Sequence, residues 1–322
     1  MKQIFAYLFC NRVTNLESIN FSGLDVVNFS FGLVKDGKCY IPNEKSLDEL
    51  LNLKGRAFKV VLSIGGWGAD GFSDAVLTEE SRNTFIDSIV KIVKEKELDG
   101  VDLDWEYPAI GSAGIKARDE DTVNFTLFME GLRKELDKLP KKQLLTCAVG
   151  AAQVCADKLE LKKLASILDY LNLMTYDMAM HNFKISHNTN LYPSKYSNIS
   201  AVETIDIFHK AGFPIEKMIM GSAFYGKVRP LRKDYTPTRW GYPFKEIDNG
   251  VLNSYNYFYD KEAEAPIYYN DDEFVSFDNV ESVSAKCKYI NEHNLAGIMF
   301  WELSSDNSKL VKAMYDNLKA NQ

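Results

Sequence analysis

The residues best suited to chemistry in this chain lie in one short segment, Asp99–Pro108, which reads DGVDLDWEYP. Acidic and apolar residues alternate along it, and a strand points successive side chains to opposite faces. One face therefore carries the acids Asp102, Asp104 and Glu106. The other face carries Val101, Leu103 and Trp105. Like charges in one enclosed place push their pKa values apart, so at least one acid should keep its proton near neutral pH. The segment thus predicts a general acid.

Such a strand needs a packed environment on both faces. A parallel strand of a barrel has one, because its outer face packs on helices and its inner face points into the barrel toward the mouth. The alternative is an acidic edge strand in water. An aromatic residue and Pro108 directly after the acids, together with the strict spacing, favour the barrel strand.

Apolar runs of strand length recur along the chain, with gaps that fit one βα unit each. Counted with the acidic segment, they favour an α/β fold of the (β/α)8 TIM-barrel type. The other expected strands are Lys2–Phe9, Asp25–Phe31, Lys59–Ile64, Leu144–Gly150, Leu168–Tyr176, Lys217–Phe224 and Leu295–Leu303. The expected helices are Thr78–Glu97, Asp119–Leu139, Asp157–Ser166, Ile199–Ala211, Glu281–His293 and Ser308–Leu318.

The barrel pattern breaks between the seventh and eighth expected strands. Residues 227–277 contain several prolines, many aromatic residues and short alternating runs such as Tyr257–Tyr259. We expect a small α+β insertion there. The domain prediction is therefore a catalytic barrel formed by residues 1–226 and 278–322, with the insertion at 227–277.

Composition narrows the range of partners. The chain has 322 residues, of which 46% are hydrophobic, enough for a large core. A net charge of -7 without a basic stripe argues against nucleic acid. A continuous apolar span of transmembrane length is missing from the sequence, so no membrane partner is expected. We expect a monomer. A signal peptide is not visible in this chain, yet a secreted or periplasmic location is favoured.

The cysteines and histidines suggest neither a metal nor a cofactor. The five cysteines are odd in number and widely spaced, which favours free buried thiols over disulfides or a zinc site. None of the four histidines has metal-ligand spacing to a carboxylate or cysteine cluster. No metal and no cofactor are therefore expected.

Three motifs resemble one enzyme family. The DGVDLDWEYP run matches, position for position, the DxxDxDxE signature of family-18 glycoside hydrolases, the chitinases and their relatives. Ser63–Gly66 resembles the family's SxGG signature, and Met174–Asp177 resembles its MxYD signature. The resemblance implies a retaining, endo-acting chitinase that cleaves β-1,4 bonds in N-acetylglucosamine polymers or oligomers, with the substrate's own 2-acetamido group as nucleophile.

The resemblance also implies a role for each catalytic residue. Glu106 would be the general acid and then the base for the incoming water. Asp104 would accept a hydrogen bond from the acetamide N–H and share a proton with Asp102. Tyr176 would donate to the acetamide oxygen. Asp99, at the base of the strand, and Trp105, on its outer face, are expected to be structural.

Aromatic and polar residues at the other strand ends are candidates for sugar binding. By resemblance, Trp301 would form the floor on which the sugar at the cleavage site stacks. The expected walls are Tyr7, Phe31, Met174, Asp177 and Tyr225. Candidates for flanking subsites are Trp67, Tyr107 and Trp240.

Several alternatives stay open at this point. The chain could be an endo-β-N-acetylglucosaminidase acting on N-glycans, a peptidoglycan hydrolase of the same family, or a non-catalytic chitin-binding lectin. Outside the family, an acid-lined metal hydrolase on a barrel would also place carboxylates at the mouth. Whether cleavage is internal or terminal depends on how the loops wall the cleft, which the sequence leaves open.

Overall fold

The computed structural model describes residues 1–13, 15–179 and 183–320. Its main sheet contains the parallel strands β1 (Gln3–Phe9), β2 (Val26–Lys35), β4 (Lys59–Gly65), β5 (Gly100–Asp104), β6 (Leu144–Gly150), β7 (Tyr170–Met174), β8 (Met218–Ala223) and β14 (Gly297–Trp301). They are neighbours in the order β1-β2-β4-β5-β6-β7-β8-β14, and β14 pairs back with β1. The sheet is therefore a closed barrel, which confirms the predicted fold. A short strand, β3 (Lys38–Tyr40), extends β2 as an antiparallel hairpin.

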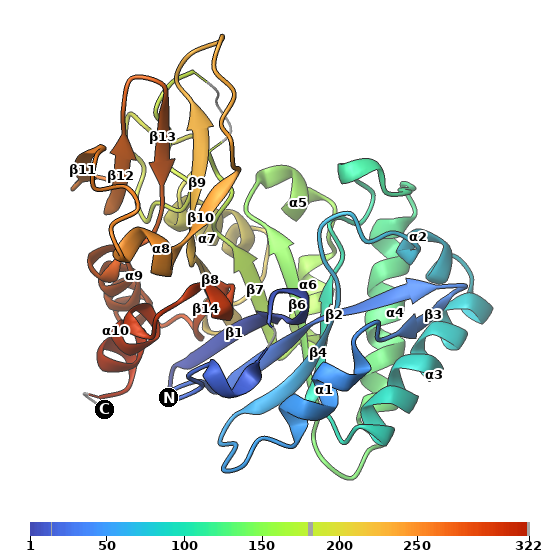
Figure 1. The fold of residues 1–322 in the computed structure, drawn as a ribbon. Helices are drawn as coiled ribbons and strands as arrows, with labels where there is room; N and C mark the ends of the chain where they lie inside the picture. The colour runs from blue at the N-terminus through green and yellow to red at the C-terminus, as the bar shows by residue number, and fades with distance from the viewer. Residues whose placement is uncertain (14, 180–182, 321–322) are drawn as a thin grey trace.

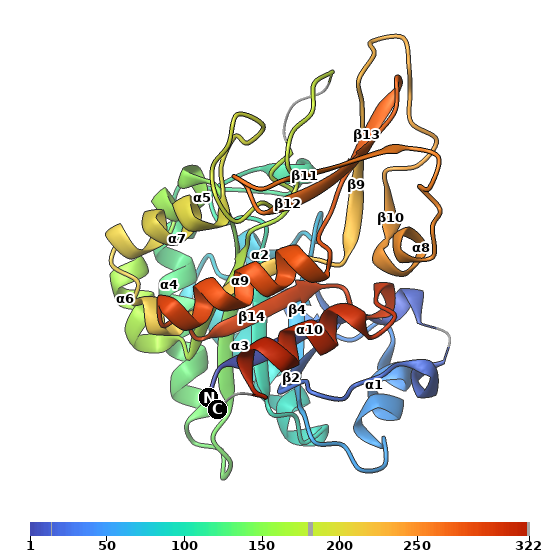
Figure 2. The ribbon, with the colours of Figure 1, turned by 90° about the vertical axis from the view of Figure 1, so that its left-hand side faces the viewer.

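Helices cover the outside of the barrel (Figure 1). The longer ones are α1 (Glu44–Leu51), α3 (Glu79–Glu95), α4 (Asp121–Leu136), α6 (Leu161–Ile167), α7 (Ala201–Lys210), α9 (Val280–Glu292) and α10 (Lys309–Leu318). Short helices α2 (Phe72–Ala75) and α5 (Gln153–Asp157) follow β4 and β6. In Figure 2, α9 and α10 lie side by side in front of β14.

Helix α3 begins where the sequence predicts it. Thr78 is the N-cap, and its hydroxyl accepts a hydrogen bond from the Ser81 amide at 3.1 Å. The Ser81 hydroxyl accepts from the Thr78 amide at 3.0 Å, which completes a capping box. Within the described ranges, none of the helices combines the length and apolar character needed to span a membrane.

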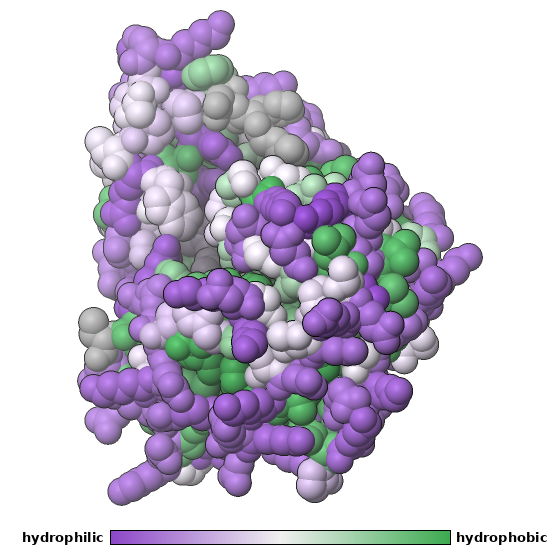
Figure 3. Space-filling view, turned by 90° about the vertical axis from the view of Figure 1, so that its right-hand side faces the viewer, coloured by the Kyte–Doolittle hydropathy of each residue, from purple (hydrophilic) through white to green (hydrophobic). Residues whose placement is uncertain are grey.

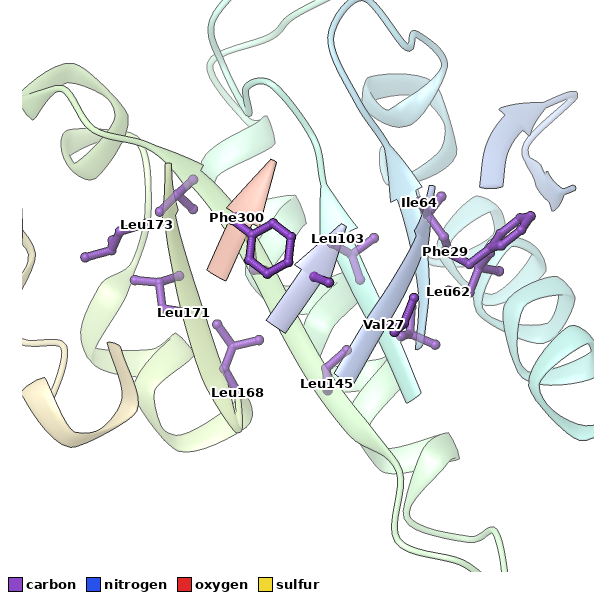
Figure 4. Packing of buried hydrophobic residues seen from close by; sticks show 14 of the residues in the cluster. Val27, Phe29, Leu62, Ile64, Leu103, Leu145, Leu168, Leu171, Leu173 and Phe300 are labelled. Carbon is purple, nitrogen blue, oxygen red and sulfur yellow. The ribbon is translucent and has the colours of Figure 1, made fainter. Parts of the chain in front are cut away.

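Each barrel strand is buried on both faces. Outward side chains such as Leu62, Leu103 and Leu145 pack between strands and helices (Figure 4). A separate inner layer fills the barrel, with Phe5, Val61, Ile219 and Met299 among its members. The surface in Figure 3 is mostly hydrophilic with scattered hydrophobic patches, as expected when the large apolar residues are inside.

The acidic strand follows this two-faced pattern. Trp105 points outward and is buried, with its ring stacked on Phe72 at 5.3 Å between centroids. Asp99 lies at the base of β5, where its carboxylate accepts from the Val60 amide at 2.8 Å and pairs with Arg56 and Lys141. Both residues are structural, as predicted. The five cysteines are buried free thiols, also as predicted.

A second sheet lies between β8 and β14 in the chain. Its antiparallel order is β10-β9-β13-β12-β11, and it stands above the barrel in Figure 1. The strands are β9 (Tyr225–Pro230), β10 (Gly241–Pro243), β11 (Asn256–Asp260), β12 (Ala265–Tyr269) and β13 (Glu273–Ser276), with helix α8 (Phe244–Asp248) beside them. An α+β insertion at this place agrees with the expected fold class. The division of the chain at residues 227 and 277 stays a prediction, and β9 itself begins at Tyr225.

A buried ion pair joins the end of this insertion to the barrel. The Lys286 ammonium on α9 lies 2.6 Å from the Asp278 carboxylate, and both side chains have 0% exposure. Asp278 also accepts from the Ser222 hydroxyl at 2.7 Å and from the Ala223 amide at 3.1 Å, both on β8. Lys286 donates to the Thr189 hydroxyl at 2.6 Å. The pair therefore ties α9, β8 and the segment after β7 together.

We predict that Lys286→Met destabilises the protein by about 3 kcal/mol, because it leaves the Asp278 charge buried without its cation. The free energy of unfolding in urea measures the effect. Lys288→Met is the matched control, since Lys288 is 74% exposed and lies 3.9 Å from Glu292, a surface pair worth at most about 1 kcal/mol. Equal unfolding free energies for the two variants would contradict the prediction.

Candidate active site

A cavity of about 970 Å³ opens where the carboxyl ends of the barrel strands meet the second sheet. Ligand sites of TIM barrels lie at this end. All the predicted catalytic and sugar-binding residues line this cavity except Asp102, which lies buried within the barrel. The lining residues among them are Tyr7, Phe31, Trp67, Asp104, Glu106, Tyr107, Met174, Tyr176, Asp177, Tyr225 and Trp301. Trp240, the third flanking candidate, also lines it.

Asp102 is fully buried and holds four hydrogen bonds from neutral donors. The donors are the hydroxyls of Tyr7 at 3.0 Å, Ser63 at 2.8 Å and Thr146 at 2.6 Å, and the Asn172 amide at 3.1 Å. Burial raises the pKa of Asp102, and the hydrogen bonds oppose that rise because they stabilise the carboxylate. Asp102 is therefore held in one orientation, facing the barrel interior.

Thr146 and Asn172 were not among the predicted site residues. Strand register explains why Thr146 reaches Asp102. In the parallel sheet, Asp102 is in register with Ser63 on β4 and with Thr146 on β6. Side chains at the same level of adjacent parallel strands point to the same side of the sheet. A polar residue at the matching level of each neighbouring strand is thus a signal that could have identified Thr146 from the sequence.

Asp104 lies at the end of β5, and its backbone is held by the paired glycines at the end of β4. The Gly66 amide donates to the Asp104 carbonyl at 2.8 Å. Gly65 has a φ of 124°, and a Cβ on it would lie 2.1 Å from the same carbonyl oxygen. Only glycine allows both the conformation and this approach. The SxGG motif therefore fixes the position of Asp104.

The side chain of Asp104 combines burial with an unused hydrogen-bonding atom. Its Oδ1 is buried and has no hydrogen-bond partner in the described structure. Burial, followed by the charges of Glu106 and Asp102, raises its pKa well above the ordinary value. A buried polar atom without a partner costs stability and is commonly kept for a ligand. Whether Asp104 shares a proton with Asp102 stays a prediction.

Glu106 follows the end of β5 and reaches the cavity. Burial raises the pKa of its carboxyl to about 7, and the negative charge of Asp177 adds to the rise. A hydrogen bond with the Tyr107 side chain acts in the opposite direction. Glu106 can thus carry a proton near neutral pH while facing a ligand-sized space, which is what a general acid requires.

Tyr176 and Asp177 come from the end of β7. Burial raises the pKa of the Tyr176 phenol well above 10, so it stays a hydrogen-bond donor. Asp177 accepts from the Tyr225 hydroxyl at 2.6 Å and from the Lys227 ammonium at 2.7 Å. Lys227 lines the cavity and was not predicted. It follows Tyr225 by two residues on β9, so alternation places the two side chains on one face.

Aromatic rings form one side of the cavity around Trp301. Its ring is stacked on Phe31 at 5.6 Å between centroids, and it lies 5.6 Å from Phe9 and 6.1 Å from Tyr7. Phe9 was not predicted, although it lies two residues after Tyr7 on β1 and therefore shares its face. Flat apolar surfaces of this kind match the apolar faces of pyranose rings.

The family model for glycosyl hydrolases family 18 matches residues 3–306 of the chain. Chitinase A1 of Niallia circulans is 34% identical over 79% of this chain and 41% of its own length, and chitotriosidase-1 of Mus musculus is 32% identical over 80% and 61%. The chain spans less than two thirds of the length of these curated relatives.

Solved structures agree in fold over almost the whole chain. A family-18 N-acetylglucosaminidase from Paenibacillus barengoltzii has a TM-score of 0.90 and 33% identity, covering 99% of this chain and 100% of that one. The chitinase ChiW from Paenibacillus sp. str. FPU-7 has a TM-score of 0.92 and 32% identity, covering 98% of this chain and 43% of that one. On these grounds the chain belongs to glycosyl hydrolases family 18.

Proposed function

We propose that this protein hydrolyses β-1,4-linked N-acetylglucosamine polymers or oligomers, with retention of configuration and with the substrate's 2-acetamido group as nucleophile. The observation that carries the proposal is the pair of neighbouring acids on one strand end. Glu106 holds a proton up to about pH 7, and Asp104 presents a buried oxygen without a partner. The first suits a leaving oxygen, and the second, which has no hydrogen-bond partner among the described residues, suits an amide N–H.

In the first step, Glu106 donates its proton to the glycosidic oxygen, and the bond from that oxygen to the anomeric carbon breaks. The acetamide oxygen of the same sugar forms a bond to the anomeric carbon in its place. Asp104 accepts a hydrogen bond from the acetamide N–H, and this hydrogen bond stabilises the positive charge that develops on the resulting ring. The Tyr176 hydroxyl donates to the acetamide oxygen and holds it in line.

In the second step, Glu106 is a carboxylate and takes a proton from a water molecule. The water oxygen bonds to the anomeric carbon, the bond from that carbon to the acetamide oxygen breaks, and the acetamide is restored. Two displacements at one carbon give net retention. The lining carboxylates in the described part of the cavity are Asp104, Glu106 and Asp177. Asp177 is engaged by Tyr225 and Lys227, and the raised pKa of Asp104 disfavours its carboxylate form, which leaves the substrate as the best nucleophile.

Chitin-type substrates are favoured over the alternatives. A lectin has no need of an acid that stays protonated near neutral pH, and Glu106 is one. The named relatives include chitinases, which supports chitin over N-glycans or peptidoglycan. We further propose that the protein acts as a monomer, with neither nucleic acid nor membrane as a partner.

The first test is hydrolysis of a chromogenic chitobioside. Wild type should cleave it at full rate in the presence of a chelator, and Glu106→Gln should lose a factor of about 10²–10⁴, because the amide keeps the shape but has no acidic proton. Binding of N-acetylglucosamine oligomers to that variant, measured by calorimetry, should remain. Loss of activity in chelator would instead support a metal hydrolase.

The pH dependence of kcat/KM should show an alkaline limb near pH 7. Glu106 must be protonated to act, and its pKa is raised to about 7, so activity is present below that pH and falls above it. Asp177→Asn should move the limb to lower pH because it removes a charge that raises the pKa. Asp316→Asn, on the outer helix α10, is the control and should leave the limb in place. A limb that stays fixed in Asp177→Asn would contradict this account.

The product should be the β-anomer at first, as followed by proton NMR during turnover. A chromogenic cellobioside, which has no acetamide, should not be cleaved at a measurable rate. Initial α-anomer, or equal rates on the two disaccharides, would rule out assistance by the substrate.

Asp104→Asn should lower kcat by a factor of about 10²–10³, in the range seen for removal of one transition-state hydrogen bond.

A further inference from the structure

The loops around the cavity differ in how they bound it, and this bears on where a chain is cut. We propose that the 3-10 helix η1 (Cys10–Arg12) and Trp240 close the cleft at its glycone end, so that the enzyme removes short fragments of constant size from the non-reducing end of a chain. The inference rests on the proposed function. It favours terminal cleavage over the internal cleavage that the sequence resemblance implies.

The barrel topology fixes the direction of the substrate. Glu106 follows β5 and Trp301 ends β14, and these strands lie on opposite sides of the closed barrel. A sugar stacked on Trp301 must turn its anomeric carbon toward Glu106 to be cleaved. Carbons 1 and 4 lie at opposite ends of a pyranose ring. The 4-oxygen, to which the rest of the glycone is attached, therefore points away from Glu106, toward the outer rim above β14.

A contact between two distant segments closes that rim. The Arg12 guanidinium in η1 lies 5.6 Å from the ring centroid of Phe9 and 5.6 Å from that of Trp240. It also lies 3.8 Å from the carboxylate of Glu302, the residue after Trp301. Arg12 comes from the segment after β1, and Trp240 comes from the second sheet, between β9 and β10. The two segments thus meet above the end of β14, which lies between them in the barrel.

Both flanks of this contact are closed as well. On one side, the Asn43 side-chain amide donates a hydrogen bond to the side-chain Oδ1 of Asn11, and it lies 3.4 Å from the Cys10 sulfur. This ties η1 to the N-terminus of α1. On the other side, the Trp240 ring lies 5.7 Å from that of Tyr225. Asn43, Asn11, Trp240 and Tyr225 all line the cavity, so a continuous rim bounds it there.

On the side next to Glu106, no hydrogen bond, ion pair or ring contact among the described residues joins the segments after β4 and β6, whereas Arg12 holds Trp240, itself 55% exposed, across the opposite rim. Trp67 follows β4 and is 68% exposed, and Val154 lies on α5 after β6 and is 51% exposed. Both line the cavity. Strands β4 and β6 are the two neighbours of β5. The aglycone side can therefore hold a long chain, whereas the glycone side is closed by η1 and Trp240. We call these two segments the wall.

The test uses the N-acetylglucosamine tetramer, pentamer and hexamer, each reduced at its reducing end so that the two ends differ in mass. In the earliest turnovers, mass spectrometry should find one unlabelled fragment size, the same for all three substrates. The viscosity of a soluble chitin derivative should fall slowly relative to the reducing ends formed. Several unlabelled fragment sizes from the hexamer at the first time points would overturn the proposal.

Removing the wall should increase the number of fragment sizes that the enzyme releases. Arg12→Ala with Trp240→Ala should release several fragment sizes from the hexamer and cut viscosity faster per bond cleaved. Trp67→Ala, on the open side, is the matched control: it should lower the rate about tenfold or more while the fragment size stays constant. An unchanged single fragment from the double variant would contradict the assigned role of the wall.

The failure of this inference can be told apart from failure of the proposed function. If wild type cleaves the chitobioside but releases unlabelled fragments of several sizes, the proposed closure of the glycone end is wrong and the proposed function stands. Wild type that cleaves neither the chitobioside nor the oligomers would overturn both. Because the wild-type fragment pattern decides by itself, the conclusion does not depend on whether the double variant folds.

Discussion

The structure depends on one electrostatic constraint, which is the placement of three carboxyl groups on the inner side of one strand end. Asp102, Asp104 and Glu106 cannot all be ionised in a buried site without a large cost. The barrel relieves this in two ways. It surrounds Asp102 with four neutral hydrogen-bond donors, and it leaves the pKa values of Asp104 and Glu106 raised. Burial thus keeps Glu106 protonated up to about pH 7, as the proposed first step requires.

The rest of the fold holds that arrangement in place. Parallel strands with a packed inner layer and a packed outer layer leave the strand ends little freedom. The glycines at the end of β4 fix the backbone of Asp104, and the buried pair of Asp278 and Lys286 fixes the end of β8. Asp278 holds the amide of Ala223 at the end of β8, and Tyr225 follows two residues later. The ion pair of Asp278 and Lys286 therefore also positions Tyr225, which lines the cavity.

Much of this could be predicted from the sequence because the barrel repeats one unit. Strand alternation alone placed Trp105 outside and the acids inside, and Leu144–Gly150 coincides with β6. Strand ends are harder to predict: the sequence predicts a strand over Leu168–Tyr176, whereas β7 covers only Tyr170–Met174. Tertiary packing sets such ends, and local pattern does not contain it.

Contacts between distant segments were the part that the sequence could not supply. Asn172 lies two strands away from β5, and only the closed barrel brings its side chain to Asp102. Arg12 and Trp240 are far apart in the chain, and nothing in either local pattern indicates that they meet. The second sheet consists of short strands of three to six residues, each too short for a distinctive local pattern. The family signatures indicate the proposed chemistry, whereas the shape of the cleft is visible only in the fold.

The central claim is that the site keeps Glu106 protonated to about pH 7 by burial and a neighbouring charge. Carbon-13 NMR of protein labelled at the glutamate carboxyl carbons measures this directly, with the Glu106 signal assigned by its loss in Glu106→Gln. The account predicts a titration midpoint near 7 for that signal. A midpoint close to the ordinary glutamate value of about 4.3 would contradict it.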